Sequence, residues 1–166
     1  LYTEQVAGFY DPPSMRLYLI SRQESPDENP MMKMQRQALK MMGTSEEEIY
    51  MAHELTHAPE DQHFELLALD LDELNDDDRI LATKSLIEGS ATVLMFDFLF
   101  GKLGMDPRRM GGQDLMGGGG GMSGSKTLDS APEIIKQQLV YPYMGGMKFV
   151  QAVMEKGGWE AVNAIY

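Results

Sequence analysis

The chain has 166 residues, enough for one domain of ordinary size, and 43% of them are apolar, which is sufficient for a hydrophobic core. The 14 Lys and Arg and 26 Asp and Glu give a net charge of −12, which repels phosphate backbones and anionic lipids and argues against a nucleic-acid partner. The absence of cysteine excludes disulfides, thiolate metal sites and a cysteine nucleophile.

The apolar stretches are far shorter than the about 20 residues that a membrane-spanning helix needs, so we expect no membrane span. The sequence begins at Leu1 rather than Met, so we expect a mature form or a piece of a longer chain. Residues 1–166 are predicted to form a single domain. Its oligomeric state stays open.

The first part of the chain favours a β-hairpin. Residues 5–20 read as two short extended runs around Asp11-Pro12-Pro13-Ser14, whose prolines fix φ and remove backbone donors. A polar segment follows, and the apolar spacing over 31–42 then predicts a helix.

A second helix is predicted to begin after Ser45, because Ser45-Glu46-Glu47-Glu48 resembles a capping box with acidic residues at the positive end of a helix. This helix runs toward His63. Pro59 lies inside it, and a proline costs about 3 kcal/mol in a helix interior. We therefore expect a kink or a terminus near Pro59.

The rest of the chain is predicted to be helical apart from its connections. The acidic stretch 60–78 reads as a solvated connection, and the apolar residues over 79–100 predict a long central helix. The glycine-rich stretch 111–124 predicts a mobile loop. Residues 131–166 read as two helices punctuated at Tyr141-Pro142-Tyr143 and Gly157-Gly158. The expected fold is α+β, mainly helical with a small N-terminal hairpin.

The motif that carries chemistry is His53-Glu54-Leu55-Thr56-His57, which fits H-E-x-x-H on a predicted helix. Two histidines four residues apart lie about 40° apart around a helix, so both imidazoles can reach one metal ion. Glu54 projects beside them and can accept a proton from a metal-activated water. The pattern indicates a catalytic zinc site.

Such a site needs a third protein ligand, and the residues leave two alternatives. Glu88 lies in the most apolar predicted helix, where an unpaired carboxylate is costly to bury and a metal ion would relieve that cost. The small residues 89–91 would let this helix approach the helix of His53 closely. His63 is the competitor, because it completes H-x3-H-x5-H. A continuous helix would turn His63 about 120° away from His57, but a break at Pro59 would weaken that objection.

The sequence resembles predicted bacterial zinc metallopeptidases of the gluzincin type, whose blocks follow in the same order over about two thirds of the chain. The matching blocks are VAGFYDP at 6–12, HELTHA at 53–58 with DQHF at 61–64, EGSAT at 88–92 and GGWEAVN at 157–163. Pro59-Glu60 departs from the Leu-Gln usual in that family. The relatives also extend beyond both ends of this chain and are often predicted to be exported.

The resemblance implies a zincin-like fold, an extracytoplasmic setting and hydrolysis of peptide bonds in a peptide or protein substrate. In gluzincins the third zinc ligand is a glutamate on a downstream helix, which corresponds here to Glu88 and favours it over His63. His53, His57 and Glu88 would then hold Zn²⁺, with Glu54 as general base. By analogy, the strand over 15–20 would pair with extended substrate.

Several supporting roles stay open. A developing oxyanion needs a donor, for which Tyr141, Tyr143, His63 and Tyr166 are unranked candidates. Asp61, four residues after His57, and Thr92, four after Glu88, are candidate hydrogen-bond partners of the ligands, although a solvent-facing Asp61 is favoured. The alternative function is a zincin-like metal-binding or inactive scaffold that binds a protein partner without catalysis.

Overall fold

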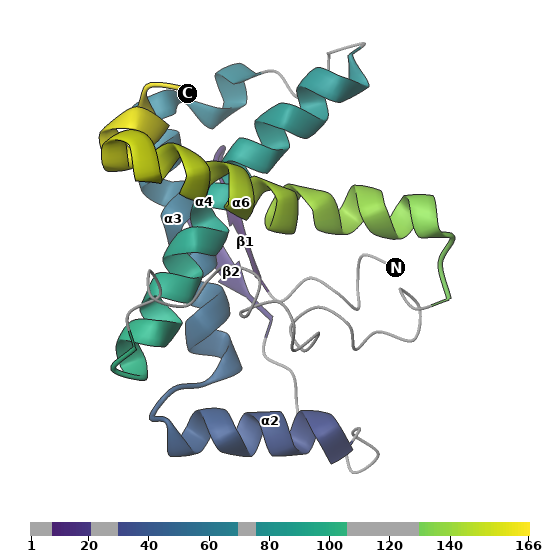
Figure 1. Ribbon diagram of the computed structural model, residues 1–166, viewed down its shortest axis with the longest axis vertical. Helices are drawn as coiled ribbons and strands as arrows, with labels where there is room; N and C mark the ends of the chain where they lie inside the picture. Colours follow the sequence, from purple (N-terminus) through teal and green to yellow (C-terminus); the bar gives the residue numbers. More distant parts are fainter. Residues whose placement is uncertain (1–7, 21–29, 70–75, 106–129) are drawn as a thin grey trace.

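The computed structural model describes residues 8–20, 30–69, 76–105 and 130–166 (Figure 1). Within these ranges the chain forms a two-stranded antiparallel sheet and four α-helices, which confirms the predicted mainly helical α+β class. The glycine-rich stretch 111–124 lies outside the described residues. In the described part, no helix is both long and apolar enough to cross a membrane.

The elements follow the predicted order along the chain. They are the strands β1 (Gly8–Asp11) and β2 (Arg16–Leu19), the helices α2 (Pro30–Met41), α3 (Glu46–Phe64), α4 (Asp77–Lys102) and α6 (Glu133–Asn163), and a short 3₁₀ helix η1 (Leu66–Leu69). The acidic stretch 60–78 is therefore only in part a connection, because its two ends belong to α3 and α4.

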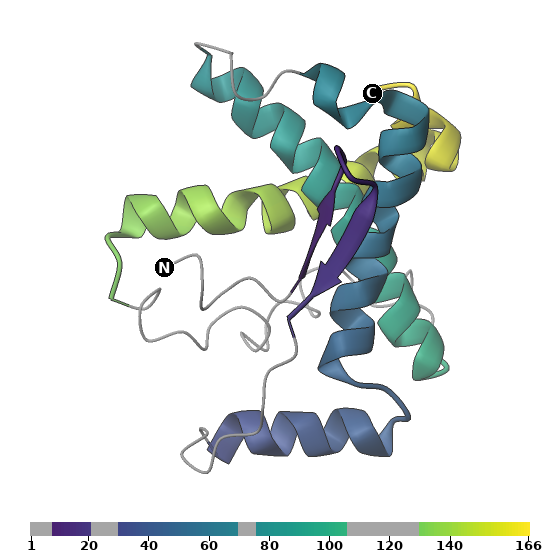
Figure 2. The same cartoon turned by 180° about the vertical axis from the view of Figure 1, so that it is seen from behind.

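The hairpin lies along α3 (Figure 2). Phe9 pairs with Tyr18 across the two strands, and their rings stack with centroids 4.8 Å apart. Met15 closes the turn with a positive φ of 52° and donates its N–H to the carbonyl of Pro12 at 3.2 Å. The hairpin thus covers one side of the helix that carries the H-E-x-x-H motif.

Helix α3 begins as predicted, with the Ser45 hydroxyl accepting the N–H of Glu48 at 3.2 Å. Of the kink or terminus expected near Pro59, the terminus is wrong, because the helix continues to Phe64. The residues after Pro59 are anchored by tertiary contacts: Glu60 bonds with Tyr166, and Asp61 bonds with Tyr10. These contacts offset the helix hydrogen bond that the proline ring removes.

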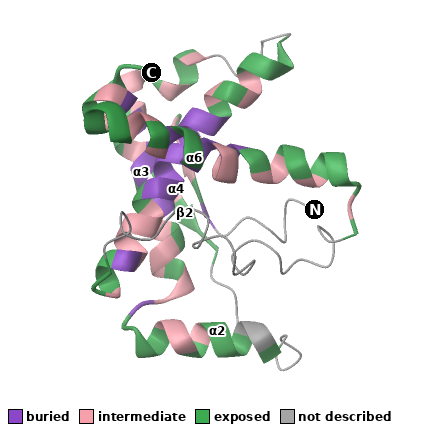
Figure 3. Cartoon of the chain, in the orientation of Figure 1, coloured by how far each residue is buried: buried purple, intermediate pink, exposed green. Residues whose placement is uncertain are grey.

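The core lies where α4 packs between α3 and α6, as the buried residues in Figure 3 show. Its buried apolar side chains come from α4 and α6 and are Leu86, Val93, Met147, Val150 and Val162. Gly89 and Gly146 let the two backbones touch, since a Cβ on Gly89 would lie 2.3 Å from the carbonyl carbon of Gly146. The small residues 89–91 were predicted to bring this helix close to the helix of His53, and this is wrong for Gly89, which packs against α6. Ser90 does face α3, where its hydroxyl bonds Glu60.

Helix α6 corrects part of the predicted punctuation of the C-terminal region. Pro142 lies inside the helix and does not end it. The predicted punctuation at Gly157-Gly158 is confirmed, because the path changes there and Gly158 has a φ of 65° that a side chain would rarely adopt. This bend turns the last residues of the chain back toward α3, where the rings of Tyr166 and Phe64 stack with centroids 4.2 Å apart.

Candidate metal centre

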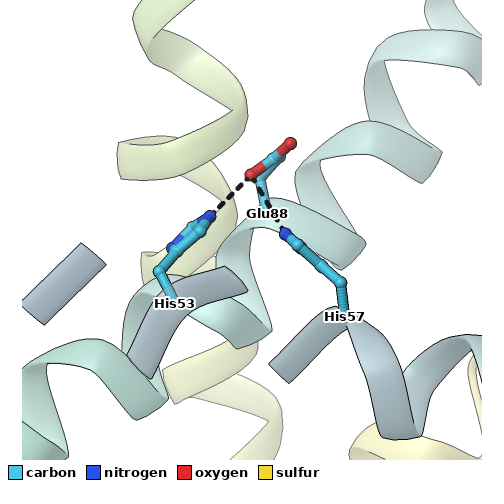
Figure 4. A group of neighbouring side chains, drawn as sticks. All are labelled: His53, His57 and Glu88. Carbon is cyan, nitrogen blue, oxygen red and sulfur yellow. Dashed lines mark hydrogen bonds and ion pairs between the residues drawn. The ribbon is translucent and has the colours of Figure 1, made fainter. Parts of the chain in front are cut away.

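Three side chains from two helices converge on one point (Figure 4). His53 and His57 lie one turn apart on α3, and Glu88 reaches them from the middle of α4. The Oε2 atom of Glu88 lies 3.0 Å from Nε2 of His53 and 3.8 Å from Nε2 of His57. The spacing of the H-E-x-x-H motif therefore does bring both imidazoles to one carboxylate.

The donor set fits a tetrahedral metal ion. Zinc with ligand bonds of about 2.0–2.1 Å separates neighbouring donor atoms by about 3.3 Å, and the two distances to Glu88 bracket that value. One ligand atom from each residue lies within 4.8 Å of the others, and this is the one such group of His, Asp or Glu side chains within the described ranges. The Glu88 side chain is 26% exposed while the imidazoles are buried, so solvent reaches the site beside Glu88.

The charges around the site also suit a cation. Glu54, Glu60 and Glu88 surround the two imidazoles, and these carboxylates contact histidines, hydroxyls and a backbone amide. Burial alone would lower the pKa of His57. The hydrogen bond to Glu60 and the charges of the surrounding carboxylates raise this pKa by more than burial lowers it, so the net shift is upward. A divalent ion would offset this excess of negative charge.

Glu54 lies on α3 between the two histidines and touches the hairpin. Its Oε2 atom accepts the backbone N–H of Tyr10 at 3.1 Å, and a Cβ on Gly8 would lie 3.3 Å from its Cγ. Burial raises the pKa of the Glu54 carboxyl, and the negative charge of Glu88 adds to that rise. The strand whose backbone bonds Glu54 is thus β1.

The hydrogen-bond partners of the ligands differ from those expected. Nδ1 of His57 lies 2.8 Å from Oε2 of Glu60, whereas Asp61 accepts the Tyr10 hydroxyl at 3.0 Å and the Leu66 N–H at 3.2 Å. The predicted role of Asp61 is therefore wrong. The Thr92 hydroxyl donates to the backbone carbonyl of Glu88 at 2.6 Å and so supports its helix rather than its carboxylate.

His63 lies away from the metal centre. Because α3 is continuous, His63 points to another side of the helix, where its Nδ1 donates to the carbonyl of Pro59 at 2.8 Å. It is exposed and lines a pocket of about 220 Å³ formed by the ends of α3 and α6 and by α4. The described structure therefore groups Glu88, and not His63, with the two motif histidines.

The four candidate oxyanion donors fall in different places. The Tyr143 ring lies 5.8 Å from that of His53, and the charges of Glu88 and Glu54 act on its hydroxyl. Tyr141 is half exposed and packs over Gly145 of its own helix. The Tyr166 hydroxyl donates to Glu60 at 2.7 Å, behind His57. Tyr143 is therefore the candidate that lies beside the site.

Sequence reasoning missed Glu60 and the backbone N–H of Tyr10. A carboxylate three residues after a ligand histidine lies on the same helix face, so the spacing of Glu60 was a usable signal. The sequence contains no such signal for the Tyr10 amide, because its contact with Glu54 depends on how the hairpin packs against α3.

The chain was also compared with known proteins. No family model, curated protein or solved structure matches it.

Proposed function

We propose that this protein is a zinc-dependent peptidase with a zincin-like fold, in which His53, His57 and Glu88 bind the ion and Glu54 is the general base. The observation that carries the proposal is that both Nε2 atoms of the H-E-x-x-H motif approach one oxygen of Glu88, with Glu54 between them on the same helix. Two imidazoles, one carboxylate and an open side are the ligand set of catalytic zinc.

When bound, a zinc ion supplies an activated water and polarises the carbonyl under attack. Glu54 accepts the proton of that water and delivers it to the leaving amine. Burial raises the pKa of its carboxyl, which makes Glu54 a stronger base for the first of these steps. The N–H of Tyr10 holds one carboxylate oxygen of Glu54 in place.

Tyr143 supplies the donor for the developing oxyanion. A phenol is protonated at neutral pH, and burial and the charges of Glu88 and Glu54 raise the pKa of this hydroxyl further above that range. A protonated phenol at the edge of the site can donate to a negative oxygen. Tyr141 and His63 lack this placement.

An extended peptide is the proposed substrate, as the resemblance to gluzincins implies, and an extracytoplasmic setting is proposed on the same ground. The edge of β1 beside Glu54 is the place where such a chain would run next to the proposed base.

The test combines metal analysis with hydrolysis of a peptide library followed by mass spectrometry. We expect about one zinc per chain, and Glu54→Gln should retain zinc while hydrolysis falls by about 10²–10⁴-fold. Tyr143→Phe should reduce hydrolysis by about 10²-fold with zinc retained. Zinc binding without hydrolysis that depends on Glu54 would favour the non-catalytic scaffold, and failure to bind zinc would overturn the proposal.

A further inference from the structure

Glu60 is a buried carboxylate for which the proposed chemistry has no use. It lies on α3 with 7% of its surface exposed, one turn after His57. A buried carboxylate is costly unless hydrogen bonds satisfy it. The hydrogen bonds that satisfy the Glu60 carboxylate therefore identify the groups that it positions.

The two oxygens of Glu60 have different partners. Oε2 lies 2.8 Å from Nδ1 of His57, on the side of the metal centre. Oε1 accepts the Tyr166 hydroxyl at 2.7 Å and also the Ser90 hydroxyl, and these two hydroxyls lie 2.9 Å apart. The carboxylate thus connects the imidazole of His57 to α4 and to the residue at the end of the described chain.

The contact with His57 selects a tautomer. A carboxylate accepts hydrogen bonds only, so the imidazole must carry a proton on Nδ1 to donate to Glu60. In the neutral ring the lone pair then lies on Nε2, the atom that faces Glu88. The same bond fixes the ring orientation.

Tyr166 in turn fixes Glu60. Its ring stacks on Phe64 with an angle of 10° between the planes, which holds the hydroxyl at Oε1 of Glu60. Phe64 is the last residue of α3, and Tyr166 follows the end of α6. The hydroxyl therefore reaches the carboxylate from an element 106 residues away in sequence.

We propose that Glu60 is a positioning residue that presents Nε2 of His57 to a metal ion, and that Tyr166 acts on the metal centre through Glu60. This inference rests on the proposed zinc site. It concerns ion binding and not the hydrolytic step, so its test measures zinc affinity in the full chain.

The test measures zinc binding by chelator competition in four single variants, one double variant (Glu60→Ala with Tyr166→Phe) and one control. Glu60→Ala removes the acceptor, and Glu60→Leu also fills its volume so that water from the adjoining pocket cannot replace it. Glu60→Gln keeps an acceptor for His57, and Tyr166→Phe removes only the hydroxyl. Glu155→Ala, an exposed acid on α6, is the matched control. The melting temperature of each zinc-free variant reports folding separately.

We expect Glu60→Ala and Glu60→Leu to raise the zinc Kd by about 10–100-fold. Glu60→Gln should stay within about threefold of the parent, since its amide oxygen still accepts from Nδ1–H. Tyr166→Phe should raise the Kd by less than about tenfold, the effect of one hydrogen bond. This loss should vanish in the Glu60→Ala background, because Tyr166 acts through Glu60.

A second measurement is the NMR signal of the His57 Nδ1 proton in the zinc-loaded protein. It should be protected from exchange in the parent, Glu60→Gln and Tyr166→Phe, and lost in Glu60→Ala. A folded Glu60→Ala or Glu60→Leu variant that binds zinc as the parent does would overturn the inference and leave the proposed function intact. A parent that binds no zinc would overturn both.

Discussion

The contact between α4 and α6 gives a sharp prediction for Gly146→Ala. A Cβ at Gly146 would lie 2.0 Å from the carbonyl oxygen of Ser85 and 2.9 Å from its carbonyl carbon. Ordinary contacts between carbon atoms are about 3.5–4.0 Å, so the helices must separate by more than about 1 Å. Because the clashing atoms belong to the backbone, no rotamer change relieves them.

The separation also weakens the core, since Met147 and Val150 of α6 pack beside Leu86 and Val93 of α4. Overpacking typically costs about 1–3 kcal/mol, and a clash with backbone belongs at the upper end. Alanine gains about 1 kcal/mol over glycine in helix propensity. We therefore expect the free energy of unfolding to fall by about 2 kcal/mol.

Urea denaturation of the zinc-free protein measures this change, and one glycine from each of the two helices serves as a control. Gly101→Ala should stabilise the protein by up to about 1 kcal/mol, because no atom lies within 4 Å of its added Cβ. Gly145→Ala should be near neutral, because the half-exposed Tyr141 ring that it meets can turn away. If the free energy of unfolding of Gly146→Ala lies within about 0.5 kcal/mol of the parent value, the close helix contact is refuted.

Two further predictions concern α3 and its ligands. Glu88→Ala should raise the zinc Kd at least about 100-fold while His63→Ala leaves it within about twofold, and the reverse pattern in chelator competition would make His63 the third ligand. The pKa of Glu47 is lowered from its usual 4.5, because its carboxylate accepts hydrogen bonds from the backbone N–H of Glu47 and from the Ser45 hydroxyl. The ionised carboxylate therefore stabilises the fold above pH 4.5, and this stabilisation is lost as the pH falls through the lowered pKa. Glu47→Gln should therefore cost about 0.5 kcal/mol at pH 7 and nothing near pH 2 in urea denaturation, and an equal loss at both pH values would contradict this account.

The sequence predicted those features that depend on local chemistry. Ser45 begins α3 because its hydroxyl accepts a nearby N–H, and this rule acts over three residues. The spacing of His53 and His57 follows from the helix repeat. Glu88 was a candidate ligand because a carboxylate in an apolar helix needs a compensating partner. Each of these inferences uses residues that are close in sequence or a cost that any fold must meet.

The wrong predictions depend on contacts between distant segments. Asp61 and Glu60 are both close enough to His57 along α3 to be its partner. Contacts with distant segments decide which of the two bonds His57. Tyr10 of the hairpin holds Asp61 away from His57, and Tyr166 holds Glu60 beside it. The same contacts anchor the turn beyond Pro59, so that α3 passes a residue expected to break it.

Three consecutive residues of α4 explain why the candidate site and the core are connected. Glu88 faces the motif histidines, Gly89 touches the backbone of α6, and Ser90 donates to Glu60. Because one rigid helix carries all three, a shift that relieves a clash at Gly89 also moves Glu88 relative to His53. The depth at which α4 and α6 pack therefore sets the donor spacing of the proposed zinc site as well as the stability of the core. Zinc affinity and the free energy of unfolding should accordingly respond together to substitutions at this contact.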